Sequence, residues 1–208
     1  MDFYGALLAR RTVRDFEDKP IPPDALERIV NAGLRAPSNN HMREWEFIVL
    51  SDKAERLKAI QMVRDDLGEA ESTAIIDAWG LTDEGQRRMY LDAIPKQHRM
   101  LLTAGSLILP LFKQDGPLLK PDSLSSLNNF ASMWCCIENM LLAAAAEGVY
   151  GVTRIPFDLE IVHLKKTLGV PDGYEIACYL ALGYPAKDRP ALRQTSADAR
   201  QKMHMNRW

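Results

Sequence analysis

The stretch RRTVRDFEDKPIPPDALERIVNAGLRAPSNNHMREWEFIVL, residues 10–50, combines an arginine cluster, two proline breaks and two patterns of apolar residues. After the prolines at 20–23, apolar residues recur at helical spacing from Asp24 onward. We expect that helix to end before Pro37, because the residue before a proline disfavours helical dihedrals. Residues 45–51 are apolar and β-branched or aromatic, which predicts a strand. The stretch therefore predicts a helix followed by a strand.

The rest of the chain continues this mixture of helices and strands. Further helices are predicted at 2–9, 53–66, 123–147 and 158–168, and further strands at 105–112, 149–155 and 174–184. Pro110 argues against a central place for the strand 105–112, because proline cannot donate to a sheet ladder. Residues 67–100 read as an irregular helical excursion. The order is that of one α+β or α/β domain spanning 1–208 with few strands, and not of a regular βαβα series.

The helix predicted at 123–147 is apolar nearly all round, which is typical of a buried helix. At 1.5 Å per residue it would be roughly 35 Å long. A chain of 208 residues can hardly enclose such a rod alone, so we expect burial against a second copy in a homodimer. The polar extension at about 186–208 ends in Trp208, which favours docking on the core or on the partner.

Composition excludes several classes of function. The net charge of −2 gives no global field for nucleic acid or for a membrane surface. No secretory signal or membrane span is recognisable, and three cysteines without a C-x-x-C motif favour a reducing, cytoplasmic setting. Cys135 and Cys136 read as small core residues. The four histidines are scattered without ligand partners, so no metal site is predicted.

Two stretches carry side chains suited to a ligand. Arg10, Arg11 and Arg14, with the hydroxyl of Thr12 between them, could hold a phosphate through bidentate contacts. The alternative is that they are solvated cations near a helix C-terminus. The polar turn within APSNNHMREWEF, residues 36–47, suits the amide edge of a heteroaromatic ligand, or is only a well-capped turn.

Together these stretches resemble the opening of the FMN-dependent nitroreductase family, whose pattern is R-R-S-x-R-x-F, a proline break, a helix, and A-P-S-x-x-N-x-Q-P-W-x-F before a strand. The likeness continues in CIENMLLAAAAEGVYG (136–151), LGVPDGYEIACYLALGYP (168–185) and the terminal HMNRW (204–208). The resemblance implies a three-layer α/β fold. Its central mixed or antiparallel sheet would be flanked by helices, with the long helix at a homodimer interface.

The resemblance also assigns candidate flavin contacts. The arginine-rich turn would grip the flavin phosphate and ribityl chain, together with a basic tail residue, for which Arg193 is the candidate. The second turn would reach the isoalloxazine ring across the dimer interface. The residues implied are Arg10, Arg11, Thr12 and Arg14 in the first turn, and Pro37, Ser38, Asn39, His41 and Arg43 in the second. His41 and Arg43 replace the family's Asn and Gln, and Glu44 replaces its Pro.

A departure occurs at GVTRIPFD, 151–158, where the family brings backbone N–H groups to the flavin N5. Pro156 has no N–H, so the donor would come from Arg154 or Ile155. Thr153, Arg154 and Ile155 complete the set of candidate cofactor contacts. Arg154 is alternatively a surface charge.

The resemblance implies that NADH or NADPH reduces FMN, which then reduces a small acceptor such as a nitroaromatic, quinone or enone by a ping-pong mechanism. The cofactor carries such chemistry, so no catalytic side chain is expected. The departures leave open a flavin-binding protein without turnover, for storage, sensing or flavin modification. A third possibility is specialised reduction, such as dehalogenation, with 67–100 as a lid.

Overall fold

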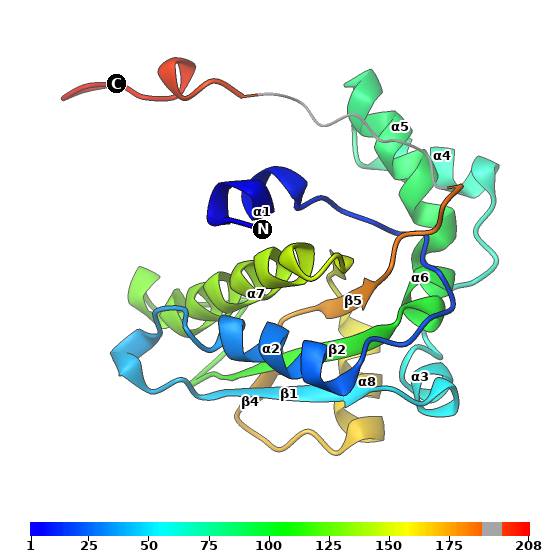
Figure 1. The fold of residues 1–208 in the computed structure, drawn as a ribbon, viewed down its shortest axis with the longest axis horizontal. Coiled ribbons are helices and arrows are strands. Elements are labelled where there is room, and N and C mark those ends of the chain that lie inside the picture. The colour runs from blue at the N-terminus through cyan, green and yellow to red at the C-terminus, as the bar shows by residue number, and fades with distance from the viewer. Residues whose placement is uncertain (189–196) are drawn as a thin grey trace.

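The computed structural model describes residues 1–188 and 197–208. Within them, five antiparallel strands form one sheet in the order β1-β2-β5-β3, with β4 also pairing β2 (Figure 1). The strands are β1 (Trp45–Leu50), β2 (Ser106–Lys113), β3 (Tyr150–Arg154), β4 (Tyr174–Ile176) and β5 (Tyr179–Gly183). The antiparallel sheet flanked by helices confirms the predicted fold class.

Helices account for most of the remaining described structure. They are α1 (Phe3–Ala9), α2 (Pro23–Gly33), α3 (Lys53–Ala59), α4 (Glu69–Ala78), α5 (Glu84–Ala93), α6 (Gln97–Thr103), α7 (Asn128–Ala146) and α8 (Asp158–Leu168). Short 3-10 turns occupy η1 (Asn39–His41), η2 (Ile94–Lys96), η3 (Leu124–Leu127) and η4 (Ala199–Gln201). Asp2 begins α1 as predicted, because its carboxylate accepts a hydrogen bond from the N–H of Gly5 at 2.6 Å.

The alternation of side chains along β2 separates two hydrophobic cores. Ile108 and Phe112 pack with residues of α2 and α7, whereas Leu107, Leu109 and Leu111 pack with residues of α3, α6 and α8. Successive strand residues face opposite sides of a sheet, so a strand that is apolar from Leu107 to Phe112 must be covered on both faces. The result is the three-layer arrangement of helix, sheet and helix.

α2 and α7 lie so close together that their contact requires a glycine. A Cβ atom at Gly33 would lie 2.6 Å from Cγ of Met140 and 2.9 Å from Sγ of Cys136. The opposite side of α7 is open in the single chain, where Cys135 and Glu138 are exposed. The expectation that Cys135 is a core residue is therefore wrong for the single chain, because it lies on this outward face.

The prediction that Pro110 keeps β2 from a central place is wrong, since β2 lies between β1 and the β4–β5 pair. The carbonyl of Pro110 accepts a hydrogen bond from the N–H of Ala177, at 2.9 Å, in the two-residue gap between β4 and β5. In a strand the N–H and C=O of one residue face the same neighbour. The missing N–H therefore falls where the ladder is already interrupted.

Other element boundaries also differ from those predicted. The helix expected at 53–66 ends at Ala59, and the strand expected at 174–184 divides into β4 and β5. The excursion at 67–100 is helical, comprising α4, α5, η2 and the start of α6. Residues 197–208 are exposed throughout and run out beyond α1, so docking of Trp208 on its own core is not seen (Figure 1).

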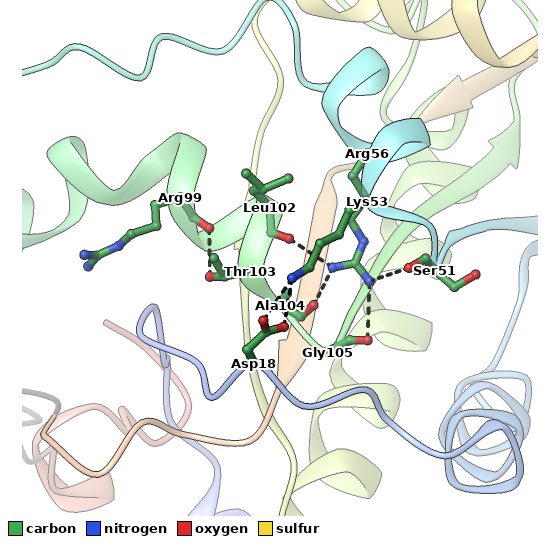
Figure 2. A network of polar contacts seen from close by, with 9 residues as sticks. All are labelled: Asp18, Ser51, Lys53, Arg56, Arg99, Leu102, Thr103, Ala104 and Gly105. Carbon is green, nitrogen blue, oxygen red and sulfur yellow. Dashed lines mark hydrogen bonds and ion pairs between the residues drawn. The ribbon is translucent and has the colours of Figure 1, made fainter.

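A buried arginine holds the end of α6 against β1. The guanidinium of Arg56, in α3, donates to the carbonyl oxygen of Leu50 at 2.6 Å. It also donates to those of Leu102 at 3.2 Å, Gly105 at 3.3 Å, Ser51 and Ala104 (Figure 2). The last carbonyls of a helix have no partner within the helix. Arg56 is only 3% exposed, and burial lowers the pKa of its guanidinium from the usual range.

Candidate functional site

A pocket of about 190 Å³ lies between the segment after α1, strand β3 and helix α7, and is called here the Arg10 pocket. The segment is fixed to β3 because the N–H of Val13 donates to the carbonyl of Gly151 at 3.0 Å. The lining residues are Arg10, Thr12, Trp134, Ile137, Glu138, Leu141, Gly151, Val152 and Thr153. The pocket therefore brings three of the predicted site residues together, namely Arg10, Thr12 and Thr153.

The three arginines of this segment have different surroundings. Nε of Arg10 lies 3.4 Å from Oε1 of Glu138, and the guanidinium of Arg11 lies 5.7 Å from the centre of the Tyr150 ring. Nη2 of Arg14 donates to Sδ of Met89 at 3.5 Å, and burial lowers the pKa of Arg14. Within the described part of the chain, neither Arg11 nor Arg14 forms a salt bridge with a carboxylate, so both guanidinium groups can bind an anion.

The second predicted turn, residues 38–43, packs against the N-terminal part of α7. The N–H of Asn39 donates to Oγ of Ser132 at 3.0 Å, and its side-chain amide donates to Asn129 at 3.0 Å. Oγ of Ser38 accepts a hydrogen bond from the N–H of Arg43 at 3.2 Å. These bonds hold the turn rigidly enough to present its remaining polar groups outward.

The backbone of this turn takes an unusual conformation. Asn40, His41 and Arg43 have φ of 51°, 58° and 46°, in the left-handed region that residues with side chains rarely adopt. Such outliers concentrate at binding and catalytic sites, which is an argument for a role of this turn. Glu44, where the resemblance expects Pro, binds Lys113 of β2 at 2.9 Å and raises its pKa.

The two parts of the predicted site lie at different places along α7. The turn contacts Asn129 and Ser132, whereas the Arg10 pocket begins at Trp134 and reaches Leu141. With a rise of about 1.5 Å per residue, the two sets of contacts together extend over roughly 18 Å of the helix, from Asn129 to Leu141. None of the residues 38–43 lines the Arg10 pocket of the same chain.

The side chain of Arg154, at the end of β3, is buried, so the alternative prediction of a surface charge is wrong. The guanidinium of Arg154 forms a buried ion pair with Glu160 at 2.5 and 2.7 Å, and its Nε donates to Gln97 at 2.7 Å. The Arg154 side chain is buried, and it does not line the Arg10 pocket. Ile155 is exposed and Pro156 is buried.

Two further predicted residues lie outside the Arg10 pocket, and a third is not described. Pro37, just before the second turn, and His41, within it, are exposed, and Arg193 lies outside the described residues. Groups of His, Cys, Asp and Glu able to hold a metal ion are absent from the described residues. Among the helices of residues 1–188 and 197–208, none has the length and apolar character needed to cross a membrane.

Sequence reasoning missed the residues that α7 contributes to the Arg10 pocket. Trp134, Ile137, Glu138 and Leu141 recur at i, i+3, i+4 and i+7, so they share one helix face. The signal that could have found them is Glu138, a charged residue within an otherwise apolar helix.

Comparison with known proteins gives a consistent result. The model of the nitroreductase family matches residues 7–184. Iodotyrosine deiodinase of Nematostella vectensis is 27% identical over 193 residues, covering 90% of this chain and 68% of that protein. The iodotyrosine deiodinase of Haliscomenobacter hydrossis is 26% identical over 188 residues, covering 89% and 80%. A crystal structure of oxidised iodotyrosine deiodinase bound to FMN and 3-iodo-L-tyrosine matches the fold with a TM-score of 0.74, at 18% identity, and each chain is covered completely.

Proposed function

The chain belongs to the nitroreductase family, and from this premise we propose that it is an FMN-dependent oxidoreductase that passes electrons from NADH or NADPH to a small oxidised acceptor. Bound FMN supplies hydride chemistry at its ring system. The observation that carries the proposal is the Arg10 pocket, which is lined by the hydroxyl of Thr12 and the ring of Trp134. The same turn carries Arg11 and Arg14, which have no carboxylate partner in a salt bridge among the described residues.

The size of the pocket supports a homodimer. Sites for ligands of this kind usually enclose about 300–1,000 Å³, which exceeds the 190 Å³ that one chain provides. The outward face of α7, with Cys135 and Glu138, would pack against a second copy. That copy's turn at 38–43 would then complete the site beside the Arg10 pocket, where Arg10, Arg11, Thr12 and Arg14 bind the phosphate and ribityl chain.

The phosphate assignment is tested by the double variant Arg10→Ala/Arg14→Ala. Hydrogen bonds between charged groups contribute about 1.5–3 kcal/mol each, so we expect FMN affinity to fall by about 100-fold or more. Flavin fluorescence during titration measures this. The matched control is Arg28→Ala/Arg64→Ala, which removes two exposed arginines from surface salt bridges with Glu147 and Asp66. Unchanged FMN affinity in the first variant would refute the assignment.

Electron transfer is tested separately from binding. The FMN-loaded wild-type protein should lose its yellow colour when NADH or NADPH is added without oxygen, and should regain it with a nitroaromatic, quinone or enone. Tight FMN binding without bleaching by either nicotinamide would favour the alternative of a flavin-binding protein without reductase turnover.

Reductive dehalogenation is a second candidate, favoured by the two iodotyrosine deiodinases that match about nine-tenths of the chain. The helical excursion formed by α4 and α5 would act as a lid over the aromatic substrate. Release of iodide from 3-iodo-L-tyrosine by the dithionite-reduced protein would favour this acceptor, whereas oxidation only by nitroaromatics or quinones would exclude it.

The dimer is tested by the reactivity of the cysteines. Cys135 is exposed in the single chain, whereas Cys136 and Cys178 are buried, and burial raises the pKa of the Cys136 thiol to about 12. We expect iodoacetamide to modify Cys135 in dilute protein and much more slowly at concentrations where the dimer forms, as mass spectrometry would show. Cys135→Ser is the control that removes the label. Full modification of a protein that sediments as a dimer would place the interface elsewhere.

A further inference from the structure

The turn that carries Arg14 is joined to the helical excursion by a network of charges. Oδ2 of Asp15 accepts a hydrogen bond from Nζ of Lys96 at 2.7 Å, and Oδ1 accepts one from Nη2 of Arg99 at 2.7 Å. Nζ of Lys96 also donates to Asp92, at the end of α5, at 2.5 Å. The side chains of Asp15, Lys96 and Asp92 are only 16–19% exposed. Partial burial makes these contacts stronger than ordinary surface pairs.

Arg14 lies at the same junction but outside the network of ion pairs. Its guanidinium contacts Met89 of α5, and the nearby carboxylates of Asp92 and Asp15 attract its charge without forming a hydrogen bond to it in the described structure. The backbone here is held independently, because the carbonyl of Asp15 accepts a hydrogen bond from the N–H of Ala186 at 2.9 Å.

The network determines what Arg14 can bind. The ammonium group of Lys96 pairs with the carboxylates of both Asp15 and Asp92, which compensates their charges without Arg14. Without Lys96, Asp92 would lose this cation and Asp15 would keep only Arg99, which is itself 62% exposed. The uncompensated carboxylates would then draw Arg14 toward themselves and repel an approaching dianion.

From this geometry we infer that Lys96 is a positioning residue that keeps Arg14 available for an anion and couples anion binding at that turn to the placement of α5 and α6. The inference rests on the proposed function, in which the anion is the phosphate of FMN. Coupling between two sites is reciprocal, so phosphate binding should stabilise the α5–α6 region as much as that region favours phosphate binding.

The first test compares two flavins that differ only in the phosphate. In Lys96→Met we expect FMN affinity to fall about 10-fold, within the range typical of coupled sites, while riboflavin affinity stays unchanged. A merely structural role would weaken both ligands equally. Asp92→Asn should leave FMN affinity unchanged or higher, because Lys96 still pairs with Asp15. Lys53→Met, which breaks an exposed Lys–Asp pair with Asp18, is the matched control.

The outcomes separate this inference from the proposed function. Failure of the wild-type protein to bind FMN overturns both. Tight FMN binding by the wild type, with equal losses for both flavins or with no loss in Lys96→Met, overturns the coupling alone.

A second measurement needs no variant and so does not depend on the folding of Lys96→Met. Amide hydrogen exchange in α5 and α6 of the wild-type protein should slow on addition of FMN and change less on addition of riboflavin at equal occupancy. Equal protection by the two flavins would overturn the link to the phosphate.

Discussion

Replacing Glu160 with alanine is expected to destabilise the protein by about 3–5 kcal/mol, which is typical when one partner of a buried ion pair is removed. The side chains of Arg154 and Glu160 are 8% and 5% exposed. The guanidinium would be left between the rings of Phe157 and Tyr179, 5.4 and 5.5 Å away, with Gln97 as a hydrogen-bond acceptor. Urea unfolding followed by circular dichroism measures the loss.

Two control variants test whether the loss in Glu160→Ala comes from the buried, unpaired charge of Arg154. Glu175→Ala removes a carboxylate paired with Lys165 at 2.8 Å, but both side chains are about one-third exposed, so the loss should stay within about 1 kcal/mol. The double variant Arg154→Met/Glu160→Leu should recover much of the stability, because apolar replacement of a buried pair avoids the isolated charge. A Glu160→Ala variant as stable as Glu175→Ala would contradict the account.

The second large effect is expected for Arg56→Met, which keeps an unbranched apolar stem but removes the guanidinium and all its hydrogen bonds. Each buried carbonyl left without a donor costs about 1–3 kcal/mol. The carbonyl of Leu50 would lose its donor, and so would those of Leu102 and Gly105, whose contacts Figure 2 shows. We therefore expect a loss of about 3 kcal/mol or more. Thermal or urea unfolding gives the global value.

The location of the Arg56 effect is also specific. Exchange of amide hydrogens should rise most in α6 and in the start of β2, because the guanidinium holds the carbonyls where these elements meet. Lys58→Met is the control, since Lys58 lies on the same helix and is paired with Glu55 at the surface. Losses of similar size in the two variants would show that the buried contacts contribute little.

Sequence patterns predicted the outline of the fold well where a local rule decides the structure. Proline breaks and helical spacing located α2, and β-forming residues located β1. The rules failed at Pro110 and Ala177, because a proline is tolerated where two strands meet end to end on the neighbouring side, and this depends on pairing distant in sequence. Residues 53–66 lacked a stop signal at Ala59, where α3 ends.

The candidate site was predictable only in part. The arginine turn was singled out by its residue types, whereas Thr153 was found through family resemblance, and the structure brings Arg10, Thr12 and Thr153 into one pocket. The buried pairing of Arg154 with Glu160 could not be foreseen, because an acidic residue in the first turn of a helix is ordinary near its positive end. The link from Asp15 to Lys96 spans 81 residues and has no local signature.

The left-handed residues Asn40, His41 and Arg43 have one more implication, for protein engineering. Glycine would adopt these dihedrals freely, so a stability screen would favour it by about 1 kcal/mol at His41 and at Arg43, and by less at Asn40, since asparagine tolerates this region. Such a thermostable product would have lost an amide, an imidazole and a guanidinium from the turn proposed to face the cofactor. Melting temperature alone is therefore a misleading guide to improving this protein.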